Sequence, residues 1–298
     1  MSVPSRQIPG PSRQIPGVYR RRIGDIVVTA ISDGYLDASY EFMRNIAPQE
    51  IEGILKDAYR PAPPRISVNA FAIHSGGRVA LVDTGSADSM GPTLGHMPKH
   101  LREAGIDSAA IDTILLTHMH PDHSNGLTGP DGVARFPDAE LVVAERDVDH
   151  WHDDAAMARA TERQKLRFFQ WAREQIKPYQ DRRRDAKGEV FPGVTAMPLP
   201  GHTPGHTGYL VSSQGQSLLI WGDIVHVPDV QTRRPDAYME PDTDPQGAVA
   251  TRQRMFDMVA SDRLLAAGMH MHFPGLLNLN RRAGGGYELV PELWDQAF

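Results

Sequence analysis

The 298-residue sequence contains no cysteine. This absence excludes disulfide bonds, thiolate metal ligands and cysteine nucleophiles. Any bound metal ion must therefore be held by nitrogen and oxygen ligands, and 13 histidines and 37 acidic residues are available to supply them.

The sequence also lacks an apolar run near the roughly 20 residues that a membrane-spanning helix requires. It has no long basic run, its formal net charge is −6, and its N-terminus does not have the pattern of a signal peptide. We therefore expect a soluble, cytoplasmic protein that acts on a small molecule, with neither nucleic acid nor a membrane as a partner.

The N-terminus carries a tandem repeat, because residues 4–10 (Pro-Ser-Arg-Gln-Ile-Pro-Gly) recur unchanged as residues 11–17. A segment so rich in proline and glycine is not expected to fold alone. It is either a simple duplication or an arm that packs on a neighbouring subunit. We expect residues 1–20 to form a flexible arm and residues 21–298 to form a single domain.

Strands and helices alternate along the predicted domain, which indicates a layered α/β fold. Apolar, β-branched runs predict strands at 23–32 (closed by a turn at Asp33-Gly34), 66–74, 78–82, 114–117, 140–144, 194–199, 208–211 and 217–221. Helical spacing and caps predict helices at 47–58, 92–104 and 245–259. The charged segment 146–177 predicts a long inserted helix, in which Leu166, Phe169 and Ile176 face the core. Its other aromatic residues, such as Phe168, either pack normally or form a wall over a site.

The chain is organised around the segment 114–123, Ile-Leu-Leu-Thr-His-Met-His-Pro-Asp-His. Residues two apart on an extended segment point the same way, so His118 and His120 can bind one ion together. Pro121 must leave the strand, which turns Asp122 and His123 toward a second position. Imidazole and carboxylate are preferred ligands of borderline metals, so the four groups suggest two metal ions.

Three later segments also place polar groups directly after an apolar strand. The first offers His202 and His206, the second Asp223, and the third His270 and His272. Together with the first cluster, these residues suffice for two metal ions that share a carboxylate. Asp83, at the end of the strand 78–82, is either a turn residue or a group that orients a metal-bound histidine.

The spacing His118-x-His120-x-Asp122-His123, followed by His202, Asp223 and His270, resembles the metallo-β-lactamase superfamily. The resemblance covers the chain from about residue 20 and implies a four-layer αβ/βα sandwich. It implies that His118, His120 and His202 hold one ion, that Asp122, His123 and His270 hold the other, and that Asp223 bridges them. It further implies that Asp83 orients a ligand, that His206 is structural and that His272 lines the pocket.

Within the superfamily, the sequence is most similar to the branch of methyl parathion hydrolases and related lactonases. Trp221-Gly-Asp-Ile-Val-His-Val227 and Phe273-Pro-Gly275 carry this resemblance. Three residues after the bridging aspartate, lactone-cleaving members have tyrosine and organophosphate specialists have an apolar residue. This chain has His226, a polar group that suits a lactone better than a thiophosphate.

The resemblance therefore implies a dinuclear metal-dependent hydrolase that opens lactones or aryl esters, with phosphotriesterase as a side activity. Two divalent ions, zinc first and manganese, cobalt or iron as alternatives, would generate a bridging hydroxide that attacks the carbonyl. We expect Asp122, Asp223 and His226 to take part in catalysis. The resemblance also implies a homodimer.

Three alternatives remain open from the sequence. The protein could be an organophosphate hydrolase of the methyl parathion type, or a thioesterase resembling glyoxalase II, which would need basic residues for glutathione. Arg233-Arg234 and Arg281-Arg282 are the candidates for that role. A metal-binding scaffold without enzymatic activity is the alternative of a different class.

Overall fold

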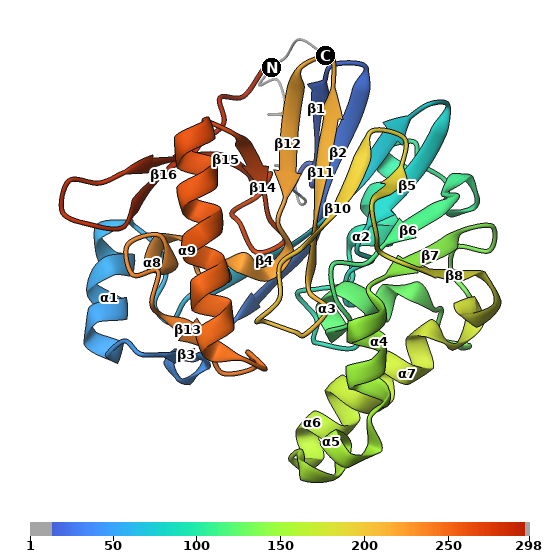
Figure 1. Cartoon of the computed structure of the whole chain (residues 1–298), viewed down its shortest axis with the longest axis horizontal. Helices are drawn as coiled ribbons and strands as arrows, with labels where there is room; N and C mark the ends of the chain where they lie inside the picture. Colours follow the sequence, from blue (N-terminus) through green and yellow to red (C-terminus); the bar gives the residue numbers. More distant parts are fainter. Residues whose placement is uncertain (1–13, 296–298) are drawn as a thin grey trace, which may run out of the picture.

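Two seven-stranded sheets face each other in the computed structural model, which describes residues 14–295 (Figure 1). Across the first sheet the strands are β1 (Val18–Ile23), β2 (Ile26–Asp37), β4 (Arg65–Ser75), β5 (Arg78–Val82), β6 (Thr113–Leu115), β7 (Glu140–Val143) and β8 (Arg183–Asp185). Across the second they are β16 (Tyr287–Pro291), β15 (Leu276–Arg281), β14 (Leu265–Ala267), β12 (Gln216–Ile220), β11 (Thr207–Ser213), β10 (Val194–Pro198) and β9 (Glu189–Phe191). A separate pair joins β13 (Tyr238–Met239) to β3 (Met43–Arg44).

Helices cover the outer faces of the sheets. The α-helices are α1 (Pro48–Asp57), α2 (Met97–Glu103), α3 (Pro121–Ser124), α4 (Glu145–His152), α5 (Asp154–Arg159), α6 (Glu162–Gln164), α7 (Trp171–Ile176), α8 (Pro228–Gln231) and α9 (Pro245–Asp262). A π-helix, η4 (Lys165–Gln170), joins α6 to α7. The 3-10 turns are η1 (Tyr40–Phe42), η2 (Ser108–Ala110), η3 (Asn125–Leu127), η5 (Lys177–Arg182) and η6 (Gly222–Ile224).

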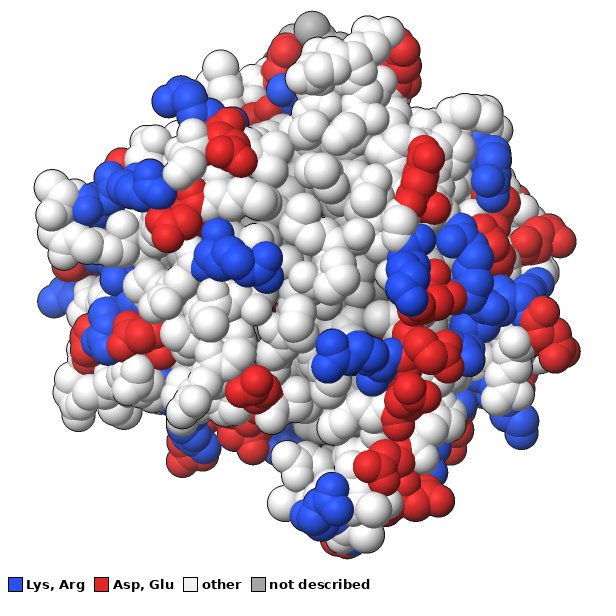
Figure 2. Space-filling model, in the orientation of Figure 1, with Lys and Arg blue, Asp and Glu red and all other residues white. Residues whose placement is uncertain are grey.

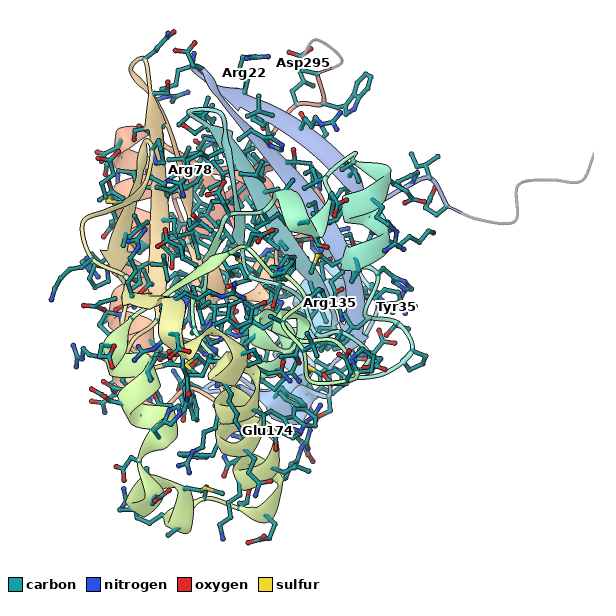
Figure 3. All side chains as sticks on the ribbon, turned by 90° about the vertical axis from the view of Figure 1, so that its right-hand side faces the viewer. Arg22, Tyr35, Arg78, Arg135, Glu174 and Asp295 are labelled. Atoms are coloured by element: carbon teal, nitrogen blue, oxygen red, sulfur yellow. The ribbon has the colours of Figure 1, made fainter. Side chains whose placement is uncertain are left out.

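The alternation of side chains along each strand builds the layers. In β5, Ala80 and Val82 pack between the two sheets, whereas Leu81 packs under the helices of the first sheet. In β12, Ile220 points between the sheets and Leu219 packs against α9. Side chains fill the space between the two sheets, as the view turned by 90° from Figure 1 shows (Figure 3). The predicted αβ/βα sandwich is confirmed.

The predicted turn at Asp33-Gly34 is wrong. Strand β2 continues through these residues and pairs with β4 both before and after them. The register shifts between Ser32 and Gly34. The Asp33 carboxylate is buried and accepts hydrogen bonds from the backbone N–H groups of Ser86 and Met97. Pairing with β4 outweighs the local turn signal, and the glycine, at φ 123°, marks a bulge.

The predicted long helix at 146–177 is also wrong, because the structure breaks it into α4, α5, α6, η4 and α7. Asp153 accepts hydrogen bonds from two N–H groups of α5, and Thr161 forms a capping box that starts α6. Phe169 and Ile176 face the core as predicted, but Leu166 is 47 % exposed. We call residues 154–176 the lid; its α5 and α6 lie away from both sheets, at the bottom of Figure 1.

Two further expectations concern the ends of predicted segments. The helix expected at 92–104 forms only as α2, since Gly95 has φ 83° and interrupts it. Most of the expected arm, residues 1–20, and most of the tandem repeat lie outside the described residues, and Val18 to Arg20 belong to β1.

Two observations concern the charged surface of the fold and the apolar character of its helices. Acidic and basic side chains are interspersed on the face shown in Figure 2. Within residues 14–295, no helix has both the length and the apolar composition needed to cross a membrane.

Candidate metal centre

The candidate ligands follow the ends of strands in both sheets. β6 runs parallel to β5, and β12 runs parallel to β14, so strands that end together deliver their following residues to one edge of the sandwich. His118 follows β6, His202 follows β10, Asp223 follows β12 and His270 follows β14. The two sheets therefore each supply part of one site.

The turn after β6 places its ligands as the sequence predicts. His120 has an extended backbone (φ −72°, ψ 157°), and Pro121 is the first residue of α3. This arrangement leaves His118 and His120 on the extended part, and it puts Asp122 and His123 on the first helical turn.

The structure brings all seven predicted ligands together, and His226 joins them. They form overlapping groups in which the candidate ligand atoms lie within 4.8 Å of one another. These groups are His118–His120–His202, His118–His123–Asp223, Asp122–His123–His270 and His202–Asp223–His226.

One carboxylate oxygen, Oδ2 of Asp223, lies at the centre of this cluster. The Nε2 atoms of five histidines surround it at 3.1–3.7 Å. These are His118, His123, His202, His226 and His270. The side chains of Asp223 and all five histidines are at most 8 % exposed, so the cluster is buried.

Oxygen atoms behind the cluster fix the orientation of three imidazoles. In each case Nδ1 faces an oxygen that can only accept a hydrogen bond, so Nδ1 donates and Nε2 of the neutral ring carries the lone pair. The three pairs are His123 with Asp83 Oδ2 at 2.7 Å, His202 with Asp242 Oδ1 at 2.6 Å, and His270 with the Ser67 carbonyl at 2.7 Å.

His118 is oriented through Thr117. The Thr117 hydroxyl donates its hydrogen to Asp83 Oδ2 at 2.7 Å, so its oxygen accepts from Nδ1 of His118 at 3.0 Å. Nε2 of His118 is thereby left with a lone pair, and it is buried without a hydrogen-bond partner. Asp83 thus orients two histidines rather than only one.

Metal ions fit this set of donors. Nε2 of His118, Nε2 of His123 and Oδ1 of Asp223 are buried and form no hydrogen bond, although buried polar atoms are normally paired. Imidazole lone pairs that face a carboxylate oxygen repel it unless a cation lies between them. Histidine nitrogens and carboxylate oxygens are ligands of zinc and related divalent metals.

The pKa shifts of Asp223 and His123 also indicate that positive charge is favoured at the centre of the cluster. Burial alone raises the pKa of the Asp223 carboxyl, but His123 and the neighbouring imidazoles lower it well below its usual range. Burial opposes charge on His123, yet Asp223, Asp122 and Asp83 together raise its pKa well above its usual range. By contrast, burial and His123 hold the pKa of His118 well below its ordinary value. Neutral His118 is therefore suited to bind a metal, not a proton.

His206 and His272, the two histidines that the sequence offers beside His202 and His270, have different surroundings. Nδ1 of His206 donates to the Leu199 carbonyl, and its Nε2 accepts from the N–H of Asp223 at 2.8 Å. Burial lowers the pKa of His206 to about 3, so its neutral ring holds Asp223 in place. His272, predicted to line the pocket, instead bonds Asp229 at 2.6 Å and is not among the residues that line it.

Sequence reasoning missed Asp242 and Asp147. Asp242 holds His202, and Asp147 accepts hydrogen bonds from the N–H groups of Met119 at 2.9 Å and Gly205 at 3.1 Å. Asp147 therefore ties the loop that carries His118 and His120 to the loop that carries His202. No local motif signals either role, since both depend on contacts distant in sequence.

Asp147→Asn is expected to weaken metal binding by about 10- to 100-fold, as is usual when groups that support ligands are changed. One of the two backbone N–H groups would face an amide that donates instead of accepting, which also lowers the free energy of unfolding by about 1–3 kcal/mol. Competition with a chromophoric chelator and thermal unfolding measure the two effects. The exposed neighbour Asp149 provides the matched control, Asp149→Asn; wild-type metal affinity in Asp147→Asn would contradict this role.

A cavity of about 450 Å³ opens beside the cluster. His120, Asp122, His202, Asp223, His226 and His270 contribute to its lining, as do the apolar residues Leu36, Phe42, Ile66, Met90, Phe168 and Met239. The Phe168 ring lies 4.7 Å from the ring of His120. The lid therefore supplies an aromatic wall at this point, and the cavity can hold a small, partly apolar molecule.

Comparison with known proteins adds to this geometry. The sequence profile described as the metallo-beta-lactamase superfamily matches residues 63–270. The uncharacterized protein YobT of Bacillus subtilis (strain 168) is 29 % identical over 165 residues, which are 54 % of this chain and 63 % of YobT. Hydroxyacylglutathione hydrolase of Vibrio parahaemolyticus serotype O3:K6 (strain RIMD 2210633) is 29 % identical over 148 residues, 50 % of this chain and 42 % of that enzyme. The chain thus matches less than two thirds of each of these relatives.

Solved structures match almost the whole chain. AbOPH, described as a hydrolase in the beta lactamase superfamily, has a TM-score of 0.89 and 33 % identity, covering 95 % of this chain and 100 % of its own. AidC, described as a dizinc quorum-quenching lactonase in complex with a product, has a TM-score of 0.87 and 25 % identity. The match covers 94 % of this chain and 99 % of the AidC chain.

Proposed function

This chain belongs to the metallo-beta-lactamase superfamily, and on that premise we propose that it is a dinuclear metal-dependent hydrolase that opens lactones or cleaves aryl esters. Phosphotriester hydrolysis is the proposed side activity. The convergence of five imidazoles on Asp223 Oδ2, beside a cavity of about 450 Å³, carries this proposal. The similarity to AidC supports zinc as the metal and a lactone as the substrate.

We assign His118, His120 and His202 to one ion and Asp122, His123 and His270 to the other, with Asp223 shared. The compact groups formed by the same residues support this division. Two divalent ions there would polarise an ester carbonyl and lower the pKa of a bound water toward about 7.

The chain itself supplies orientation and charge. Asp223 is ionised at neutral pH, because the surrounding imidazoles lower its pKa; it therefore holds cations firmly and keeps an accepted proton only briefly. Asp122 is the second carboxylate of the proposed ligand set, and its Oδ2 lies 3.4 Å from Nε2 of His270. The apolar wall with Phe168 excludes water from the bound ester.

We propose that His226 orients the substrate by donating a hydrogen bond to its ester oxygen. His226 lines the cavity, stacks on His270 with ring centroids 5.0 Å apart, and is 6 % exposed. Its backbone N–H donates to the side chain of Gln231 at 2.7 Å, which fixes its loop. Burial lowers the pKa of His226 to about 4, so the ring is neutral and has one hydrogen. Carried on Nε2, which faces Asp223 Oδ2 at 3.1 Å, this hydrogen points toward the ligand cluster, where the ester would bind.

His226→Phe is expected to lower kcat/KM for a lactone by about 10- to 100-fold, the range that one hydrogen bond to a developing charge supplies. Metal content should stay unchanged, as measured by elemental analysis. His272→Phe, outside the cavity, is the matched control. Unchanged lactone turnover would refute the orienting role, and loss of a metal ion would make His226 a ligand instead.

The thioesterase alternative receives less support. The arginines offered for glutathione, Arg233, Arg234, Arg281 and Arg282, do not line the cavity. Arg234 pairs with Glu50 and Asp236, and Arg281 pairs with Asp257. The homodimer and the cytoplasmic location stay predictions.

A substrate panel on one metal-defined sample tests the proposal. The panel contains an aromatic lactone, an acyl-homoserine lactone and a paraoxon-like triester, and we expect the highest kcat/KM for a lactone. Dominant triester hydrolysis would favour the organophosphate hydrolase. A metal-loaded sample that hydrolyses no ester, lactone, thioester or triester would favour the scaffold.

A further inference from the structure

Two arginines of the lid line the cavity. Arg163 lies in α6 and Arg167 lies in η4, four residues further along. Among residues 14–295, neither guanidinium forms an ion pair. The Arg167 guanidinium carbon lies 5.5 Å from the centre of the Trp171 ring, which supports its stem but does not neutralise its charge.

The unpaired charges oppose each other in the free protein. Like charges four residues apart on a helix are destabilising, and burial followed by repulsion from Arg163 lowers the pKa of Arg167. Arginine nevertheless keeps its charge in proteins. An anion bound between the two side chains would relieve both the repulsion and the partial loss of hydration.

The position of the pair places such an anion next to the reacting group. Phe168, directly after Arg167, packs on the ring of His120 at 4.7 Å. Arg167 also interacts electrostatically with Asp122. Arg167 lies in η4, which is a π-helix. This conformation is rare in proteins as a whole, but where it occurs it is often at a functional site.

The part of the cavity around β3 and β13 carries mixed charges. Glu41 of η1 and Glu240, which follows β13, line it together with Arg44 of β3, so carboxylates outnumber guanidinium groups there. Figure 1 shows these strands and the α5–α6 end of the lid on different sides of the lower edge. The lid contributes only positive charge to the lining, from Arg163 and Arg167, so it is the more favourable side for an anionic group.

We infer that Arg167, assisted by Arg163, binds an anionic group of the substrate, a carboxylate or a phosphate, so that the enzyme selects acidic esters or lactones over neutral ones. The guanidinium fork matches either oxyanion with two parallel hydrogen bonds. The inference rests on the proposed hydrolase function and specifies its substrate class.

The test compares 4-acetoxybenzoate with its methyl ester, which differ in one negative charge remote from the acetyl group. Wild-type, metal-loaded protein should favour the acid, and the preference should fall as ionic strength rises. Arg167→Gln should lower kcat/KM for the acid by about 10- to 100-fold, the range of one charge-assisted contact, and change the methyl ester by less than about twofold. Arg159→Gln, exposed on α5 and outside the cavity, is the matched control.

The outcomes separate the inference from the function on which it rests. A stronger preference for 4-acetoxyphenyl phosphate would support the anion site and identify phosphate as the group. An acid-to-methyl-ester ratio that Arg167→Gln leaves unchanged would overturn the inference while the hydrolase function stands. If no ester is cleaved, calorimetric binding of 4-hydroxybenzoate decides: tighter binding to wild-type than to Arg167→Gln supports the site, and equal binding overturns it.

Discussion

Asp223→Ala is expected to lower kcat/KM for ester hydrolysis by more than about a hundredfold, because even residues that only support metal ligands cost about 10- to 100-fold. The loss has a specific cause. Asp223 Oδ2 is the atom on which five imidazole Nε2 atoms converge at 3.1–3.7 Å. Without this carboxylate, the negative charge that we propose two cations share would disappear. Metal content, measured by elemental analysis after gel filtration, should fall in parallel with activity.

A control separates this effect from the loss of any paired carboxylate in the same segment. Asp229, which is half-buried, lies six residues further along the chain and pairs with His272 and Arg60 away from the proposed ligands. Asp229→Ala should keep both metal content and activity. A folded Asp223→Ala variant that retains its metal ions and more than a tenth of the activity would contradict the sharing of Asp223 between two sites.

Removal of the metal ions is expected to abolish hydrolysis and to lower the midpoint of thermal unfolding by roughly 10–20 °C. Each ion at a hundred times its dissociation constant stabilises the folded state by about 2.7 kcal/mol, two ions by about twice as much, and each kcal/mol shifts the midpoint of a chain near this size by about 2–4 °C. The proposed ligands come from both sheets, so bound ions would join parts of the fold that only the native state brings together. Calorimetry before and after dialysis against a chelator measures the shift.

The choice of metal added back provides the control for chelation. Zinc should restore both activity and thermal stability, because the donors are mostly imidazole nitrogens. Magnesium, which prefers oxygen ligands, should restore neither. Recovery with magnesium alone, or full activity in the presence of the chelator, would contradict the assignment of the site.

The sequence was sufficient to predict the features whose determinants are local. The apolar residues Ala80, Leu81 and Val82 predict a strand at 78–82, and β5 forms there, with side chains that pack on both of its faces. The segment His118 to His123 carries its ligands within one turn, so its geometry follows from strand direction and from Pro121. These predictions needed no knowledge of distant contacts.

Features that depend on distant contacts were not predictable. Asp147 accepts a hydrogen bond from the N–H of Met119, which lies 28 residues away in sequence. Asp242 accepts one from His202, which lies 40 residues away. The Asp33-Gly34 signal was local and misleading, because pairing of β2 with β4 decided the outcome. The breaks in the lid follow from the caps at Asp153 and Thr161, which compete with a continuous helical pattern.

The most direct test of the dinuclear account is the number of metal ions that activity requires. Metal-free protein is titrated with zinc while lactone hydrolysis and protein-bound zinc are measured on the same samples. For a dinuclear site we expect two bound ions per chain, with activity that keeps rising until the second equivalent has been added. Full activity after one equivalent, with no further change, would contradict it.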